Sequence, residues 1–432
     1  MKIYGYLISN CQELKTFILF RDKTSELQFV SGFAIIRSRR YIENTFVYGG
    51  GCCVIFRNGE LFSGPGGIAL GAKMSGFIDE NGNQWGFKHQ WANDFDQDTV
   101  DTYKLNILND PDDKTTFCED VAEFPIGNKN ILPDIDSLMF GFPCNDYSSV
   151  GKQKGLNGCY GPLYSYGVKA MRVYKPKVFV AENVDGLSSA NEGYALVKIL
   201  KEFADSGYHI TPNLYKFEEY GVPQTRHRII IVGIRNDLYE KGIHFHVPAP
   251  TTVNPNDQKT AQQAIEEPPI SDSTPNNEMP KTTKRVAERL SYIPEGENAW
   301  YEGIPESLRL NVKGARLSNI YKRLTHNKPA YTVTGSGGGG TKMYHWKENR
   351  ALTNRERARL QTFPDDFKFV GSRESVRKQI GMAVPPEGAK VVLQAVLKTF
   401  AGIDYDWVKP TEKLQLRNLL NTDGSSLKGI DK

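Results

Sequence analysis

The sequence predicts an α/β fold in which helices cover a mostly parallel β-sheet, followed by a second, smaller domain. Two observations predict it. Short runs rich in β-branched and aromatic residues alternate with amphipathic helical stretches from residue 56 to residue 235. The composition then changes to a segment rich in Pro, Asn, Thr and Asp between Val247 and Glu278. Strands that alternate with helices form parallel sheets, because each helix carries the chain back across the sheet.

The expected elements follow one another along the first half of the chain. The expected strands are Arg57 to Phe62, Gly86 to Ala92, Ser137 to Phe142, Lys177 to Glu182, His209 to Leu214 and Arg228 to Ile234. Helical periodicity lies between them at Gln97 to Asn106, Gly167 to Tyr174 and Gly193 to Ser206, and returns at Asn354 to Gln361 and Glu387 to Phe400.

A chain of 432 residues is too long for one hydrophobic core, so we expect several domains. Residues 56–240 form the first domain, and residues 241–349 form the loop-rich second one. Residues 350–402 come next, and their last helix is expected to return to the first domain. Residues 1–55 read as an N-terminal extension of unknown role, and residues 403–432 as a tail.

Bulk properties exclude several classes of protein. No apolar run reaches the roughly 18 residues that a membrane span needs, and the N-terminus lacks the pattern of a secretory leader. We therefore expect a cytoplasmic protein. The six cysteines form no CxxC pair and no Cys/His ligand spacing, so we expect no metal and no disulfide framework. Any cysteine with a function is then a free thiol.

Positive charge is concentrated late in the chain. The stretch from Arg309 to Leu360 contains twelve Lys and Arg residues but only two acidic residues, Glu348 and Glu356. This net charge of +10 leaves −6 for the remainder, because the whole chain carries +4. The stretch also holds tyrosines and the glycine tract Gly337 to Gly340, a mixture suited to approaching a polyanion. A solvated face is the alternative, and we favour nucleic acid.

A glycine-rich turn from Phe62 to Gly67 follows the first expected strand. Glycines at such a turn let the backbone pass close to a ligand held above a strand end. The turn has no GxGxxG register, and a plain tight turn is the alternative. Asp94 and Phe95 at the next strand end offer a carboxylate for ribose hydroxyls and a ring for adenine, and Asp120 an acceptor for the adenine amine. Together they suit an adenosyl ligand.

A cysteine and a carboxylate also follow expected strands. Pro143 and Cys144 come after one apolar strand, and Glu182 ends the next one. A lone cysteine is more often a buried apolar residue, but open α/β sheets place their chemistry at such strand ends. Arg226 and Arg228 lie two residues apart and would point to one face of an extended chain. Arg228 could hold a bound base and Arg226 support the site electrostatically; an exposed strand start is the alternative.

The ordered motifs resemble those of the DNA cytosine-5 methyltransferases, especially the bacterial restriction-modification type. The resemblance covers about residues 58–402. It rests on Phe62-Ser63-Gly64-Pro65-Gly66-Gly67, Pro143-Cys144-Asn145-Asp146-Tyr147-Ser148, Glu182-Asn183-Val184, Gln224 to Arg228, Arg350 to Glu356 with Ala358-Arg359-Leu360-Gln361 and Phe363-Pro364-Asp365, and Gln379 to Pro386. Six motifs in the family's order make chance a poor explanation.

The resemblance implies a Rossmann-like, S-adenosylmethionine-dependent methyltransferase that flips a cytosine out of duplex DNA and methylates carbon 5 through a covalent cysteine adduct. The implied catalytic residues are the nucleophile Cys144, the proton donor Glu182, and Arg226 and Arg228. Those around S-adenosylmethionine are Phe62, Gly64, Gly66, Gly67, Asp94, Phe95 and Asp120. Residues 149–161 resemble the mobile catalytic loop, and residues 241–349 the target-recognition region, with Gln153, Lys154, Arg323 and Lys342 as expected DNA contacts.

The resemblance also implies a monomer that partners double-stranded DNA, needs no metal and protects host DNA, with a cognate restriction endonuclease acting separately. Two residues depart from the family pattern. Met382 stands where asparagine is common, which puts one polar contact near the cofactor in doubt. Tyr160 stands where an arginine often precedes the glycine of the catalytic loop.

Three other functions compete with this interpretation. A related branch of the family methylates tRNA cytosine, but the large basic insertion before Arg350 favours DNA. A non-catalytic relative would be expected to lack Cys144 or Glu182, and both are present. A nicotinamide or flavin oxidoreductase has the wrong glycine register.

Overall fold

The structure is a computed structural model that describes residues 46–48, 51–142, 163–188, 193–311, 317–335 and 339–415. The chain divides into two compact units, residues 1–55 with 76–86 and residues 56–75 with 87–432. In the first unit, β1 (Phe46–Tyr48) pairs antiparallel with the start of β2 (Gly51–Leu61). Its second hairpin joins β3 (Phe77–Ile78) to the start of β4 (Gln84–Asp94).

The second unit contains the expected sheet, in the strand order β5-β4-β2-β6-β7-β10-β8. The remaining strands are β5 (Thr116–Cys118), β6 (Ser137–Gly141), β7 (Val178–Val184), β8 (Tyr208–Lys216) and β10 (His227–Arg235). The pairs β4–β5, β2–β6 and β6–β7 are parallel. The prediction of a mostly parallel sheet is therefore confirmed, and every expected strand is present.

One strand of this sheet runs against the others. β10 pairs antiparallel with both of its neighbours, β7 and β8. Only residues 217–226 separate β8 from β10, and they include the 3-10 turn η6 (Phe217–Tyr220) and the short strand β9 (Gln224–Thr225). A parallel crossover needs a dozen or more residues, so the chain returns directly and β10 is reversed.

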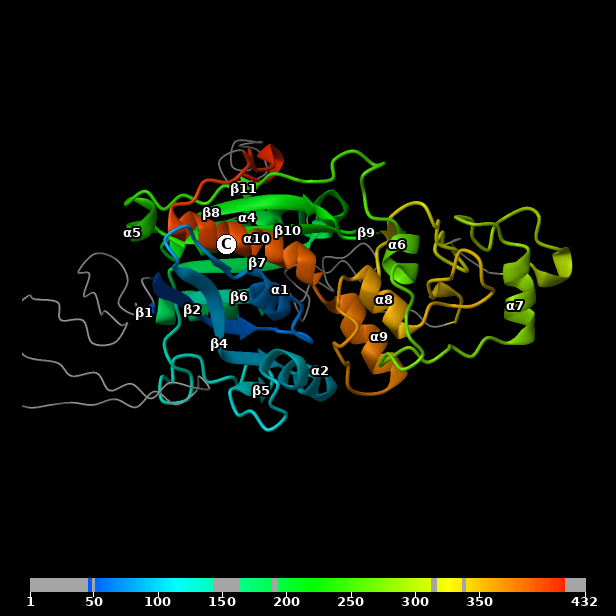
Figure 1. Cartoon of the computed structure of the whole chain (residues 1–432), viewed down its shortest axis with the longest axis horizontal. Helices are drawn as coiled ribbons and strands as arrows, with labels where there is room; N and C mark the ends of the chain where they lie inside the picture. Colours follow the sequence, from blue (N-terminus) through cyan, green and yellow to red (C-terminus); the bar gives the residue numbers. More distant parts are fainter. Residues whose placement is uncertain are drawn as a thin grey trace, which may run out of the picture. The chain divides into compact units, whose positions relative to one another are not determined.

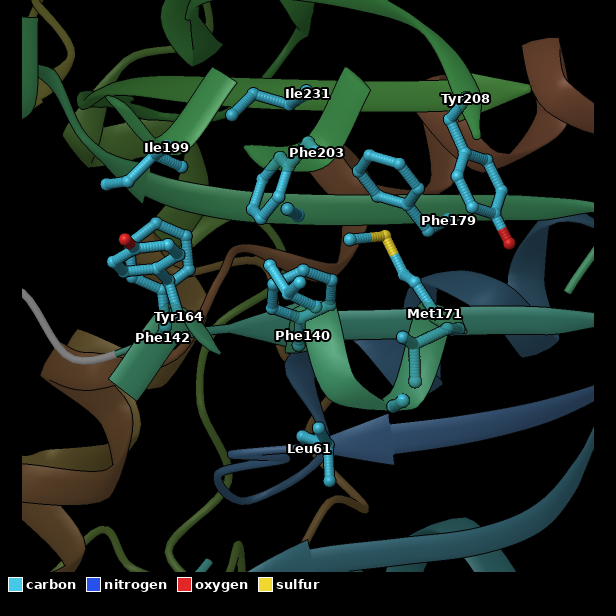
Figure 2. Close-up of a cluster of buried hydrophobic side chains, with 14 of the residues drawn as sticks. Leu61, Phe140, Phe142, Tyr164, Met171, Phe179, Ile199, Phe203, Tyr208 and Ile231 are labelled. Atoms are coloured by element: carbon cyan, nitrogen blue, oxygen red, sulfur yellow. The ribbon is translucent and has the colours of Figure 1, made fainter. Parts of the chain in front are cut away.

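Aromatic and aliphatic side chains join one face of the sheet to the helices α3 (Tyr164–Tyr174) and α4 (Tyr194–Asp205). Figure 2 shows the core of this layer, in which Phe140 and Phe179 from the strands meet Phe203 from α4. The ring centroids of Phe179 and Phe203 lie 5.2 Å apart, edge to face. Burial of this layer fixes the strand ends that carry the candidate chemistry.

The remaining helices of the sheet domain come from distant parts of the sequence. They are α1 (Gly67–Ser75), α2 (Gln97–Tyr103) with the π-helical η1 (Lys104–Leu108), η4 (Asp185–Ser188), α5 (Asn236–Tyr239) and α10 (Pro386–Ala401). Figure 1 shows α10 beside α1 at the sheet, and the two helices pack closely. Among the described residues, α10 therefore packs against a helix from the first half of the chain.

The later part of the chain is rich in loops and has its own apolar clusters. Its short elements are β11 (Val247–Pro248), α6 (Ala261–Glu266), α7 (Lys284–Ser291), η7 (Glu306–Leu308), β12 (Ala330–Tyr331), η8 (Gly339–Thr341), α8 (Asn354–Leu360), α9 (Arg373–Met382), β13 (Trp407–Val408) and η9 (Glu412–Leu414). Residues 241–349 fall in the same compact unit as the sheet, so their separation as a domain stays a prediction.

Two kinds of feature are absent from the described residues. No helix there is long and apolar enough to cross a membrane. No group of three or more His, Cys, Asp and Glu side chains there is arranged to hold a metal ion.

The close approach of α1 and α10 depends on Gly71. A Cβ atom at this position would lie 2.6 Å from Ala389 Cβ and 2.8 Å from the Pro386 carbonyl oxygen, a backbone atom that cannot rotate away. We predict that Gly71→Ala lowers the free energy of unfolding by about 1–3 kcal/mol, measured by denaturant titration. The matched control is Gly86→Ala, whose Cβ would make an ordinary 3.5 Å contact with Ile55. Equal stability of the two variants would contradict the prediction.

Candidate active site

Glu182 lies at the end of β7 and forms an ion pair with Arg228 of β10. The distance from Glu182 Oε1 to Arg228 Nε is 2.9 Å, and the two side chains are 14% and 12% exposed. Burial raises the pKa of Glu182 above its ordinary value, and the charges of Arg228 and Arg226 partly oppose that rise. A larger share of this carboxyl group is therefore protonated at a given pH than in an exposed glutamate.

The neighbouring strand β6 leaves room for this carboxyl group. Gly141 faces Glu182 in the parallel register, and a Cβ atom at Gly141 would lie 3.2 Å from Glu182 Oε2. Asn183 Nδ2 donates a hydrogen bond to the Phe142 carbonyl, at 3.1 Å, and so fixes the chain where it leaves β6. Cys144 follows two residues later but lies outside the described residues, as do Gln153, Lys154 and Tyr160.

Arg226 lies inside the protein, with 2% of its surface exposed. Its Nη1 donates to the Val333 carbonyl at 2.9 Å, and its Nη2 donates to the carbonyls of Gly381 and Ala383 at 3.1 and 2.9 Å. Its charge also lowers the pKa of Glu182. Arg226 therefore places a positive charge near Glu182 and connects two late backbone segments, at residue 333 and at residues 381–383, to the start of β10.

Two glutamines complete this connection, and no individual role was predicted for either. Gln224 Nε2 donates to the Leu360 carbonyl at 2.9 Å and to Gln361 Oε1 at 2.7 Å, and its Oε1 accepts from Val333 N at 2.8 Å. Gln361 Nε2 in turn donates to the Ile380 carbonyl. Both glutamines are fully buried. Their membership of two motifs was the only signal that could have pointed to them.

The glycine-rich turn is held to the neighbouring strand ends by its backbone. Gly64 N donates to Asp94 Oδ2 at 2.9 Å, and Ser63 N donates to the Asn93 carbonyl at 3.0 Å. Asn93 Nδ2 then donates to the Glu119 carbonyl at 2.8 Å. The ends of β2, β4 and β5 are thereby joined.

The turn adopts backbone conformations that favour glycine. Phe62, Gly64 and Gly66 have φ angles of 54°, 56° and 96°. A Cβ atom at Gly67 would collide with the Val384 carbonyl, whereas at Gly64 no other atom lies within 4 Å of where a Cβ would be. Gly67 therefore packs against the late part of the chain, and Gly64 leaves open space over the turn.

Three of the residues expected around the cofactor lie at the ends of two adjacent strands, β4 and β5. Asp94 is largely buried, burial raises its pKa, and it binds the amides of Gly64 and Asp96. Phe95 is 61% exposed, and Lys378 Nζ lies 5.6 Å from its ring centroid. Asp120 is exposed and accepts from Ala122 N. An exposed ring, an exposed carboxylate and the space over Gly64 fit an adenosyl group.

The prediction that Arg323 contacts DNA is wrong. Its side chain is buried, and its Nη1 donates to the carbonyls of His345, Trp346 and Glu348 at 2.8, 3.1 and 3.0 Å. Its Nη2 donates to the Leu290 carbonyl at 2.8 Å and to Asn349 Oδ1. A guanidinium that holds the fold of this region in this way cannot reach a DNA groove. Lys342 is partly exposed, and its contact with DNA stays a prediction.

Comparisons with known proteins identify the family of this chain. The family described as C-5 cytosine-specific DNA methylase matches residues 56–398. Among curated proteins, Type II methyltransferase M.BbvI of Brevibacillus brevis is 57% identical, over 81% of this chain and 93% of that protein. Type II methyltransferase M.NgoFVII of Neisseria gonorrhoeae is 42% identical, over 82% and 90%.

A solved structure gives the same fold. An E. coli structure titled as a prophage-encoded DNA modification methyltransferase superposes with a TM-score of 0.58 at 22% identity, over 80% of this chain and 99% of that one. At this identity the likeness concerns the fold alone. The family match spans most of the chain and the curated relatives are similar over nearly their whole length. The chain therefore belongs to the C-5 cytosine-specific DNA methylase family.

Proposed function

We propose that this DNA cytosine-5 methyltransferase flips its target cytosine out of the duplex and methylates it through a covalent adduct with Cys144. The observation that carries the proposal is the buried Glu182–Arg228 pair, which lies beside Gly141 on the strand that leads to Cys144. A carboxyl group here can hydrogen-bond to the pairing edge of a cytosine only when the base is outside the helix. In a base pair, nitrogen 3 and the exocyclic amine of cytosine are already hydrogen-bonded.

Glu182 binds and protonates the base in this proposal. Burial raises the pKa of this carboxyl group; in its protonated form it donates to nitrogen 3 of cytosine, and its other oxygen accepts from the exocyclic amine. Arg228 holds the carboxyl group through Nε and hydrogen-bonds to its own strand through Nη1. This arrangement stabilises the electron density that builds up in the ring when a nucleophile adds to it.

Cys144 supplies that nucleophile. Its thiolate forms a bond to carbon 6, and the electron pair of the 5,6 double bond moves to carbon 5, which becomes nucleophilic and takes the methyl group. A base or water then removes the proton from carbon 5, the double bond re-forms, and the thiolate leaves. Asn183 holds the backbone of Phe142, two residues before Cys144 in the sequence.

S-adenosylmethionine, when bound, supplies the electrophilic methyl group. The glycine turn would lie under the ligand at Phe62, Gly64 and Gly66, while Gly67 packs beneath them. Phe95 would stack on the adenine ring, Asp94 would accept from ribose hydroxyls as well as from Gly64 N, and Asp120 would accept from the adenine amine.

We further propose that the enzyme works as a monomer in the bacterial cytoplasm and belongs to a restriction-modification system, with a separate cognate endonuclease. The two curated relatives named above are titled Type II methyltransferases, which supports that setting. Residues 241–349 would read base edges in the major groove. The same relatives do not favour the alternative tRNA substrate.

The covalent step gives the most direct test. We predict that Cys144→Ser abolishes methyl transfer, because a serine hydroxyl is far less nucleophilic toward carbon 6. Duplex DNA with 5-fluorocytosine should trap the wild-type protein as an adduct that survives denaturing electrophoresis. The control is Cys53→Ser, since Cys53 lies in the part of β2 that pairs with β1, nine residues before the glycine-rich turn begins at Phe62. Normal turnover by Cys144→Ser would refute the mechanism.

The raised pKa of Glu182 predicts a pH dependence. Activity that needs protonated Glu182 falls as pH rises through that pKa, so kcat/KM should have a descending alkaline limb. We predict that Glu182→Gln lowers kcat by about 10²–10⁴-fold and removes this limb, because the amide cannot give up a proton. Measurement of kcat/KM against pH for both proteins tests it. An unchanged alkaline limb in Glu182→Gln would assign the titration to another group.

A further inference from the structure

Helix α8 carries three arginines with covered side chains, and their surroundings differ. Arg355 is fully buried and donates to three backbone carbonyls, those of Pro275, Pro364 and Phe367, at 2.9, 2.8 and 2.6 Å. Arg359 pairs with Asp365 and donates to carbonyls near α6. These two side chains therefore have acceptors within the protein.

Arg357 lies between them with 3% of its surface exposed, and its guanidinium group has no such acceptor. No hydrogen bond or ion pair to it is formed by any residue in the described ranges. Its guanidinium nitrogen atoms are not fully enclosed, so each keeps a small area exposed to solvent. The adjacent carboxylate of Glu356 is already bound by Arg350, at 2.7 and 2.8 Å.

Other cations lie near Arg357. Arg377 of α9 is close enough for its charge to lower the pKa of Arg357, which burial brings down to about 10. The Arg377 Nε atom is enclosed without an acceptor, and its Nη2 donates only to Glu374, a side chain that is 83% exposed. Tyr331 also interacts electrostatically with Arg357, and Lys322 Nζ lies 5.1 Å from the Tyr331 ring centroid.

Tyr331, which links this group of cations, belongs to the two-stranded sheet of β12 and β9, and β9 leads into β10. Tyr331 of β12 faces Thr225 of β9 in a parallel pair, one residue before Arg226. A buried guanidinium without an acceptor is unfavourable, and a second cation nearby makes it more so. An anion with several oxygens would relieve both costs, and a phosphate matches the fork of donors that arginine presents.

We propose that Arg357, with Arg377 and Lys322, forms a binding site for one backbone phosphate of the DNA duplex. The proposal rests on the proposed function, because it takes DNA as the substrate. The site contributes affinity and positions the duplex, and it carries no sequence information, since every nucleotide presents the same phosphate.

The test measures DNA affinity against salt concentration for the full-length protein. Arg357→Met keeps the apolar stem and removes the charge, and Arg357→Lys keeps the charge. We expect Arg357→Met to weaken binding to any duplex several-fold and to reduce the slope of log K against log salt by about one, the value for one lost phosphate contact. Arg357→Lys should retain the wild-type slope. The melting temperature of Arg357→Met should stay level or rise, since an unpaired cation is removed.

Arg355→Met is the matched control from the same helix. Its loss leaves the carbonyls of Pro275 and Phe367 without a donor, so its melting temperature should fall while the salt slope stays wild-type. A wild-type slope in Arg357→Met, or a fall in its melting temperature equal to that of Arg355→Met, would overturn the proposed phosphate site. Wild-type methylation of DNA is measured in parallel, and its absence would instead refute the proposed function.

Discussion

The buried guanidinium of Arg226 holds together the parts of the chain that make up the candidate active site. It binds the carbonyls of Val333, Gly381 and Ala383, which follow it by 107, 155 and 157 residues. The next residue, Val384, packs its backbone against Gly67 at the start of α1. The turn that would hold the cofactor and the strand that holds Glu182 are thus connected through one short late segment. The late motifs therefore hold in place the site residues that come from the first half of the chain.

Local pattern was sufficient to predict much of the sheet and its strand ends. Runs such as Lys177 to Glu182 are apolar and β-branched, and burial on both faces of a central strand requires that composition. The start of α8 was also readable, since Thr353 and Glu356 form a capping box. These features depend on residues only a few positions apart, which is the range over which a single sequence is informative.

The rest could not be predicted, because it depends on contacts between distant residues. The hydrogen bond between Gln224 and Gln361 joins residues 137 positions apart. The sequence around either glutamine does not indicate that the other is its partner. The same limit explains the error at Arg323. A basic stretch indicates nucleic acid, but the pattern does not show which cations face outward. Arg323 and Arg355 are buried among backbone carbonyls, so less of the charge between residues 309 and 360 is available to DNA than the count implies.

In this DNA cytosine-5 methyltransferase, segments that are distant in the sequence assemble one candidate site. Bisulfite sequencing of DNA from cells that express the protein tests this most directly, since it reports both the modified base and its sequence context. We predict 5-methylcytosine at one recurring sequence in the genomic DNA, and none in cells without the gene. Unmodified DNA, or methylation confined to tRNA from the same cells, would contradict the account.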